Sequence, residues 1–268
     1  MKLAFSTLGC PDWPFDRVLE QAQTMGYQGI EIRGIQGEMR ADRIPQFSAE
    51  QAADTKRRLR EAGIEIADFA SSVRFDDTVD RDAMLEEGRA CVDTCARMGI
   101  PFIRIFGNNI PDEASEPRLI RQVGDGVREL CAYAATKDIG ILLEVHGDFN
   151  TLPRLLGVVD RAASENFGIL WDIAHSDHAY REHFAEFYQP IRHLVRHVHV
   201  KDHLHTPDGV KLSLVGEGDI PIAAIVRMLE EDGYDGFYSL EWEKKWVPEL
   251  AEPEVAFPAY VKAMRGML

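Results

Sequence analysis

Short apolar runs alternate with longer amphipathic stretches along the whole chain. The apolar runs have the length and composition of buried parallel strands, and glycine or proline lies at many of the joints between segments. The amphipathic stretches carry apolar residues at helical spacing. Strands are expected at residues 2–6, 30–33, 64–69, 101–106 and 236–241, with others opening at 140, 167 and 194. Helices are expected at 16–25, 48–63, 80–99, 116–137, 152–163, 183–188, 219–233 and 253–264, and a long loop at 202–218.

This order gives eight strands, each followed by a helix, with a repeat of about 34 residues and no linker or break in composition. It predicts one α/β domain over residues 1–268, a (β/α)8 TIM barrel whose active site lies at the C-terminal rim of the strands. A doubly wound open sheet is the alternative. That fold would place Gly-x-Gly-x-x-Gly after the first strand, whereas the nearest run, residues 34–37, follows the second strand with the wrong spacing.

Composition and charge narrow the class of protein. Of the 268 residues, 45% are hydrophobic and 28% charged, and the formal net charge of −15 disfavours nucleic acid or an anionic membrane as partner. The N-terminal apolar run is too short for a signal peptide, and no stretch reaches the ~20 apolar residues of a membrane helix. The four cysteines are interpreted as small buried residues. A cytoplasmic protein is expected.

Four of the expected strands end in residue types that bind metals. Their C-terminal ends carry Glu144, Asp172, His199 and Glu241, which should converge because parallel strands end on one side of a sheet. Unpaired carboxylates in a dry interior repel one another, and a divalent cation relieves this. Three carboxylates and one imidazole suit one Mn²⁺, with Mg²⁺, Co²⁺ or Zn²⁺ as alternatives. The competing interpretation is an ion-pair cluster with Arg104, Arg196 or Lys201.

Other side chains near these strand ends have roles that the sequence leaves open. His146 shares a face with Glu144 and either reaches the site or forms a hydrogen bond in a loop. His197 is expected one layer below His199, and Asp202 is expected to orient a ligand. His175, just after Asp172, suits a hydrogen bond to substrate. The remaining candidates are histidines expected in loops with no common role, His178, His183, His203 and His205, and aromatic residues for a pocket wall or for ordinary packing, Trp13, Phe69, Phe106, Trp242 and Trp246.

The order Glu…Asp-x-x-His…His-x-His-x-Lys-Asp…Gly-Glu-Gly…Glu resembles the xylose isomerase-like barrels of the sugar phosphate isomerase/epimerase superfamily. That group includes ketose 3-epimerases, hydroxypyruvate isomerases and inosose dehydratases, and residues 26–31 and 214–220 also fit its pattern. The resemblance covers nearly the whole chain. It implies metal ligation by Glu144, Asp172, His199 and Glu241, acid/base roles for Glu144 and Glu241, and homo-oligomers such as dimers or tetramers. The substrate-binding residues would be His175, His146, Lys201, Arg104 and Glu217.

Endonuclease IV shares this barrel but requires a three-zinc cluster with further histidines on earlier strands. Here the second, third and fourth strands end in Glu31, Phe69 and Phe106, which supply no histidine. Together with the acidic charge, this argues against a nuclease.

The chemistry of such a site predicts a metal-dependent sugar isomerase or epimerase. The metal would polarise a carbonyl and stabilise the enediolate formed when a proton leaves the adjacent carbon. A keto-polyol or keto-sugar dehydratase of inosose dehydratase type begins with the same step, and a barrel that only binds metal and sugar, or serves as a partner subunit, is a further alternative. Without a glycine-rich phosphate loop, and with only Arg33, Arg104 and Lys201 as cations at the rim, a neutral sugar or polyol is expected rather than a phosphosugar.

Overall fold

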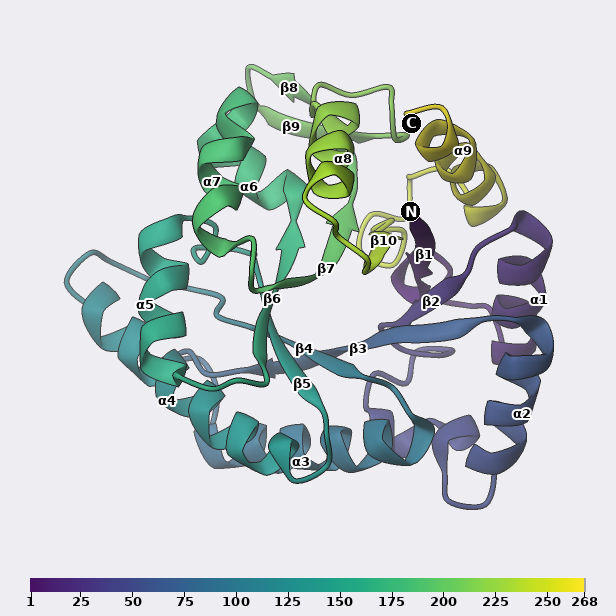
Figure 1. Cartoon of the computed structure of the whole chain (residues 1–268), viewed down its shortest axis with the longest axis horizontal. Coiled ribbons are helices and arrows are strands. Elements are labelled where there is room, and N and C mark those ends of the chain that lie inside the picture. Colours follow the sequence, from purple (N-terminus) through teal and green to yellow (C-terminus); the bar gives the residue numbers. More distant parts are fainter. Residues whose placement is uncertain (268) are drawn as a thin grey trace.

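The computed structural model describes residues 1–267, in which eight parallel strands close into a barrel (Figure 1). Consecutive strands are neighbours, and the eighth pairs with the first, so the barrel has no free edge. The fold predicted from the alternating pattern is therefore confirmed. The barrel strands are β1 (Lys2–Ser6), β2 (Gly29–Ile32), β3 (Glu65–Arg74), β4 (Phe102–Phe106), β5 (Gly140–Glu144), β6 (Phe167–Asp172), β7 (Val195–Val200) and β10 (Phe237–Leu240).

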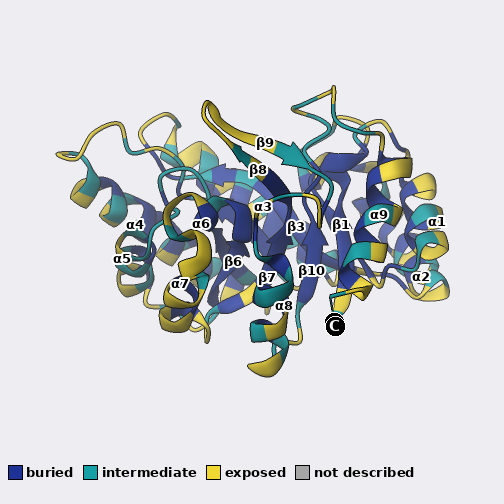
Figure 2. Cartoon of the chain, turned by 90° about the horizontal axis from the view of Figure 1, so that it is seen from above, coloured by how far each residue is buried: buried dark blue, intermediate teal, exposed yellow. Residues whose placement is uncertain are grey.

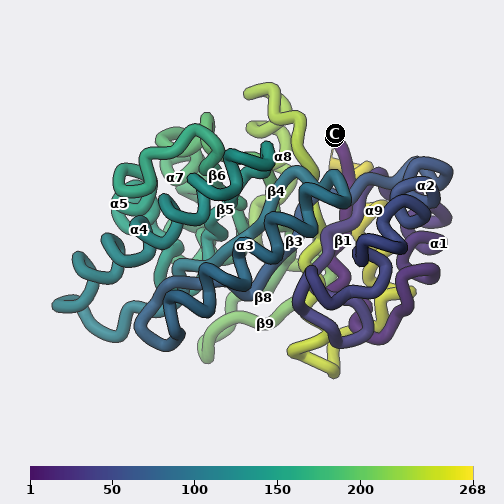
Figure 3. Tube along the Cα trace, turned by 90° about the horizontal axis from the view of Figure 1, so that it is seen from below, coloured from purple at the N-terminus to yellow at the C-terminus, as the bar shows by residue number. Residues whose placement is uncertain are grey.

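Helices surround the barrel and cover its outer face, so the strands form the buried centre of the molecule (Figures 2 and 3). The connection after β6 holds two helices, and the other connections between barrel strands hold one α-helix each. Short 3₁₀ turns lie at Thr7–Gly9, Ala41–Arg43, Pro45–Phe47 and Arg181–His183. The α-helices are α1 (Phe15–Met25), α2 (Ala52–Ala62), α3 (Arg81–Met98), α4 (Glu116–Ala135), α5 (Leu152–Ala162), α6 (Ile173–Tyr180), α7 (Phe184–Ile191), α8 (Ile222–Glu231) and α9 (Pro253–Arg265).

Small and apolar residues fill the lower part of the barrel interior. Ala4, Ala67 and Phe237 pack together as a cluster separate from the main core between strands and helices. A Cβ at Gly29 would lie 2.5 Å from the ring of Phe237, so glycine there leaves room for the ring. Above this layer the interior becomes polar, because the side chains that follow along the strands are charged.

The long loop expected at 202–218 contains an antiparallel hairpin. Strands β8 (Asp202–Thr206) and β9 (Gly209–Ser213) pair from Asp202 with Ser213 to Thr206 with Gly209. The turn sequence Thr206-Pro207-Asp208-Gly209 has proline and glycine at places that favour a type I turn. The prediction missed the hairpin because its strands are short, polar and outside the barrel, where no apolar run marks them.

Two further expectations about helices were wrong. A helix, α6, begins directly after β6, so His178 lies on a helix and not in a loop, and His203 and His205 lie on β8. The helix expected at 219–233 begins only at Ile222, as α8, because the carboxylate of Asp219 accepts the backbone N–H of His205 at 2.7 Å and does not cap a helix.

The cysteines behave as expected, since all four lie in the described part of the chain as buried free thiols. Among residues 1–267, no helix combines the length and apolar character needed to cross a membrane.

Candidate functional site

Glu144, Asp172, His199 and Glu241 converge at the C-terminal rim of the barrel. Each offers one ligand atom, and these atoms all lie within 4.8 Å of one another. From Nδ1 of His199 the distances are 3.4 Å to Glu144, 3.7 Å to Asp172 and 3.5 Å to Glu241. Three of the residues are fully buried and Glu241 is 6% exposed. The four side chains predicted from strand ends are therefore brought together.

The order of strands in the barrel explains this convergence. The four residues come from β5, β6 and β7 and from the position just after β10, and these strands are consecutive neighbours in the closed sheet. Asp172 and His199 are direct cross-strand partners. Asp172 also caps α6, because its Oδ1 accepts the N–H groups of Ala174 and His175 while Oδ2 faces the site. Capping fixes the carboxylate in one orientation.

Glu31, at the end of β2, sets the orientation of His199. Its Oε2 lies 2.8 Å from Nε2 of His199 and 3.0 Å from Nε2 of His197, and all three side chains are buried. His199 therefore turns Nδ1 toward the other three carboxylates. A carboxylate that holds the second ring nitrogen is a frequent partner of a metal-binding histidine. His197 lies below His199 and is hydrogen bonded in the interior, as predicted.

Two buried acids close to the site, Glu31 and Asp68, were not among the predicted site residues. They are paired across β2 and β3, and both oxygens of Asp68 lack a hydrogen-bond partner among the described residues. Burial, reinforced by the charge of Glu31, raises the pKa of Asp68 to about 7. Glu31 lies near the C-terminal end of an apolar strand, which is the same sequence signal that marks the four predicted ligands.

Lys201 and Arg104 bring positive charge into the same site. Nζ of Lys201 lies 2.9 Å from Asp172, 2.6 Å from Glu241 and 2.8 Å from Glu243. Nε of Arg104 lies 3.0 Å from Glu144, and its guanidinium stacks 3.9 Å above the ring of Phe106. Arg196 is exposed and contacts backbone carbonyls instead. Of the three bases in the competing ion-pair interpretation, Arg104 and Lys201 thus contact the predicted carboxylates and Arg196 does not.

These cations leave an excess of negative charge. The six acids in or beside the site are Glu31, Asp68, Glu144, Asp172, Glu241 and Glu243, and the bases are Arg33, Arg104 and Lys201. Glu31, Glu241 and Glu144 outweigh the effect of burial on His199 and raise its pKa well above the ordinary value. The excess of negative charge thus favours a further positive charge at this point, either on the imidazole of His199 or on a cation bound beside it.

The donor atoms fit a divalent metal. Two buried atoms that face the centre of the cluster, Oε1 of Glu144 and Nδ1 of His199, make no hydrogen bond in the described residues. Oε2 of Glu144 and Oδ2 of Asp172 have only the ion pairs with Arg104 and Lys201. Buried polar atoms without a partner are costly, and coordination would satisfy them. Carboxylate oxygens with one imidazole form a set that binds Mn²⁺, Mg²⁺, Co²⁺ or Zn²⁺.

The two glutamates predicted to transfer protons have different pKa values. Burial raises the pKa of Glu144, but the opposing charges of Arg104 and His199 outweigh it and hold the pKa at about 2. Burial also dominates at Glu241, where Lys201 and His199 compensate only in part, and its pKa rises to about 7. Two carboxyl groups whose environments separate their pKa values in this way are suited to different roles in proton transfer.

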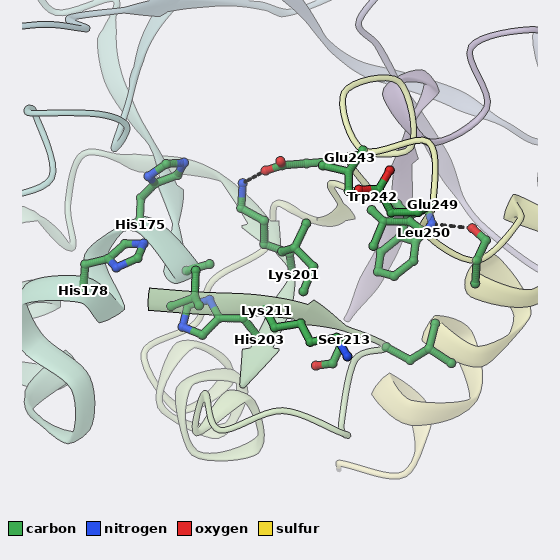
Figure 4. A pocket seen from close by; sticks show the side chains of 16 residues that line it. His175, His178, Lys201, His203, Lys211, Ser213, Trp242, Glu243, Glu249 and Leu250 are labelled. Carbon is green, nitrogen blue, oxygen red and sulfur yellow. Dashed lines mark hydrogen bonds and ion pairs between the residues drawn. The ribbon is translucent and has the colours of Figure 1, made fainter. Parts of the chain in front are cut away.

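A cavity of about 740 Å³ opens beside this cluster (Figure 4). Lys201 connects the two, since it lines the cavity and contacts Asp172 and Glu241. His175 and His178 lie on one side and Trp242, Glu243 and Leu250 on the other.

Of the other residues predicted to bind substrate, His175 lines this cavity and Glu217 does not. His146 packs against His175, with ring centroids 4.2 Å apart, and against Phe106. Burial, with the nearby charge of Lys201, lowers the pKa of His175 to about 3, so its ring is neutral. Glu217 is exposed and is not among the described residues that line the cavity.

Of the proposed aromatic wall, only Trp242 lines the cavity. Phe69 and Trp13 are buried in the core, and Trp246 is 58% exposed. Asp202 does not orient a ligand. Its carboxylate accepts backbone N–H groups of His203, Gly216 and Gly218, and so ties the Gly-Glu-Gly segment to the hairpin.

The family model for the xylose isomerase-like TIM barrel matches residues 19–265. The chain belongs to this family. Among curated relatives, the inosose dehydratase of Yersinia enterocolitica is 28% identical over 170 residues, which cover 55% of this chain and 56% of that protein. An uncharacterized protein of Methanocaldococcus jannaschii is 34% identical over 90 residues, or 32% of this chain and 29% of that protein. The matched segments thus span about half or less of these relatives.

Solved structures of other barrels match the fold over nearly their whole length. A probable 3-DHS dehydratase of Bacillus anthracis has a TM-score of 0.81 at 18% identity, with 99% of each chain covered. The IOLI protein, solved with a zinc atom, has a TM-score of 0.81 at 20% identity over 100% of this chain and 98% of that chain. A 3-keto-D-glucoside 4-epimerase of E. coli gives 0.76 at 18% identity, covering 100% and 98%. The solved structures that share this fold therefore include a probable dehydratase and an epimerase.

If Glu31 orients His199, Glu31→Gln should weaken Mn²⁺ binding by about 10–100-fold, because an amide oxygen cannot supply the charge that the two histidines share. Isothermal titration of metal-free protein measures this. Glu20→Gln, an exposed substitution of the same kind on α1, is the matched control and should leave the affinity unchanged. Equal affinities for all three proteins would remove Glu31 from the metal site.

Proposed function

We propose that this protein is a divalent-metal-dependent sugar isomerase or epimerase. One observation carries the proposal: three carboxylates and an imidazole converge on one point beside a cavity large enough for a sugar, and Oε1 of Glu144 and Nδ1 of His199 have no hydrogen-bond partner there among the described residues. We assign Glu144, Asp172, His199 and Glu241 to one metal ion, Mn²⁺ by preference. Bound there, the metal would act as a Lewis acid that makes the proton next to a carbonyl easier to remove.

The protein's own groups then transfer the proton. Glu241, with a pKa of about 7, is suited to accept or return a proton near neutral pH. Glu144 is held as a carboxylate by Arg104 and is the second acid/base group in this proposal. Return of the proton to the opposite face would give epimerisation, and return to the neighbouring carbon would give isomerisation.

The neutral ring of His175 and the ammonium of Lys201 are assigned to substrate hydroxyl or carbonyl oxygens, because both line the cavity. Lys201 already contacts three carboxylates, and the acids Glu243 and Glu249 line the same cavity. The two lysines of the lining, Lys201 and Lys211, are matched by these two acids, so the described lining offers no excess of cations to bind a phosphate group. This supports a neutral sugar or polyol as the substrate class.

A dehydratase is the second candidate, and the similarity to an inosose dehydratase favours it. It would begin with the same proton removal and then lose a β-hydroxyl group. Incubation with Mn²⁺ and a panel of ketoses and inososes in D₂O separates the candidates. An isomer or epimer that carries deuterium supports the proposed function, and a product that has lost water supports the dehydratase. Deuterium in recovered substrate alone supports the proton removal that both candidates share. No exchange and no product with any member would favour a barrel that only binds.

Substitutions at the rim should separate proton transfer from metal binding. Glu144→Gln and Glu241→Gln should keep part of the metal affinity but lose at least about 100-fold in turnover, because an amide oxygen can bind the metal but cannot accept the proton. Asp172→Asn should act through metal affinity and be partly rescued by excess Mn²⁺. Steady-state rates over a range of Mn²⁺ concentrations measure both effects, with Glu20→Gln as the control.

If both glutamine variants keep the wild-type rate, the acid/base roles given to Glu144 and Glu241 are wrong, whatever the state of the metal site. If excess Mn²⁺ rescues the glutamine variants as well, their defect lies in binding and not in proton transfer.

A further inference from the structure

A second group of metal-ligand side chains lies where α6 meets the β8–β9 hairpin. Asp177 comes from α6, and His203 and His205 come from β8. Oδ2 of Asp177 lies 3.0 Å from Nε2 of His203 and 2.7 Å from Nε2 of His205, and the two ring nitrogens are 3.3 Å apart. None of these residues belongs to the first cluster. Asp177 and His203 are buried, and the side chain of His205 is 25% exposed.

The spacing of these atoms matches the edge of a tetrahedral zinc site. With metal–ligand bonds of ~2.0–2.1 Å, two ligand atoms of a tetrahedron lie about 3.3 Å apart. The two imidazole nitrogens already have this separation. The carboxylate oxygen is closer to them, as in a hydrogen bond, and would need to withdraw by roughly half an ångström to reach a tetrahedral position.

The other ring nitrogen of His205 faces a second carboxylate. Oδ2 of Asp219 accepts the backbone N–H of His205 and lies 3.6 Å from its Nδ1. At this distance the carboxylate makes no hydrogen bond to Nδ1, but its negative charge favours the tautomer with the proton on Nδ1, which leaves Nε2 free to bind a metal. Carboxylate, histidine and metal form this same series in many zinc proteins.

We propose that Asp177, His203 and His205 form a second metal site, specific for Zn²⁺. Two imidazoles and one carboxylate, with a fourth position left for water, are a common zinc ligand set and are softer than the oxygen-rich set at the barrel rim. The zinc fastens the hairpin to α6. Because Lys211 and Ser213 of β9 line the cavity together with His203 and His178, the zinc also fixes this wall of the cavity (Figure 4).

Zinc binding to the metal-free protein tests this proposal directly. Equilibrium dialysis against Zn²⁺ should give two ions per wild-type chain, with one retained in Asp172→Asn. This substitution weakens the rim site, and asparagine at the N-cap can still hold the first turn of α6, which carries Asp177. His205→Gln, at the partly exposed position, should lose the second ion, with an affinity lower by at least about 100-fold. His183→Gln, at an exposed histidine that pairs with Glu186, is the matched control and should keep both ions.

The visible absorption of bound Co²⁺ tests the second site without relying on the folding of the histidine variants. Co²⁺ added to metal-free Asp172→Asn should produce the intense visible absorption of a tetrahedral site, and one equivalent of Zn²⁺ should abolish it. Asp219→Asn in the same background should weaken the binding by about 10–100-fold.

The proposal is overturned if Asp172→Asn binds no zinc and gives no tetrahedral cobalt spectrum, or if His205→Gln binds as much zinc as wild type. None of these measurements uses turnover, so they test the second metal site independently of the proposed enzymatic function.

Discussion

Glu31 accepts hydrogen bonds from His197 and His199 with a single oxygen, and the geometry of the rim depends on this interaction. It joins β2 to β7, on different sides of the barrel, and so can form only when the barrel is closed. By occupying Nε2 of His199, it turns Nδ1 toward Glu144, Asp172 and Glu241. The orientation of the candidate metal ligand is thus a product of the fold as a whole.

A second constraint is the concentration of charge in a dry interior. Burying several carboxylates together is unfavourable unless cations or hydrogen bonds offset their repulsion. Arg104 offsets Glu144, while Lys201 offsets Asp172 and Glu241. The compensation is incomplete, because Oε1 of Glu144 and Nδ1 of His199 keep no hydrogen-bond partner in the described residues. Such sites are retained for function and seldom for stability, and this supports the proposed metal chemistry.

The barrel and its four candidate ligands could be predicted because each depends on a local signal. An apolar strand that ends in Glu144, Asp172, His199 or Glu241 places that residue at a rim common to all strands. The partners of these residues could not be predicted in the same way. Glu31 meets His199 across 168 positions of the chain, and the contacts of Lys201 depend on rotamers that no spacing rule determines.

The helix α6 and the hairpin were missed for another reason. Both lie outside the barrel, and neither presents one apolar face to a core, so the periodic pattern that marks the other elements is weak in them. Their main chemical signal is a set of histidines, His178, His203 and His205. The sequence gives these residues no common role, whereas the structure shows that His203 and His205 both contact Asp177.

The most direct test of this account is a crystal structure of the protein loaded with Mn²⁺, with diffraction data collected where manganese scatters anomalously. We expect one strong anomalous peak at the rim, within about 2.0–2.6 Å of an atom from each of Glu144, Asp172, His199 and Glu241. No peak at the rim, with Lys201 and Arg104 still paired to these carboxylates, would show that the cluster is an ion-pair network. In that case the proposed metal-dependent function would be wrong.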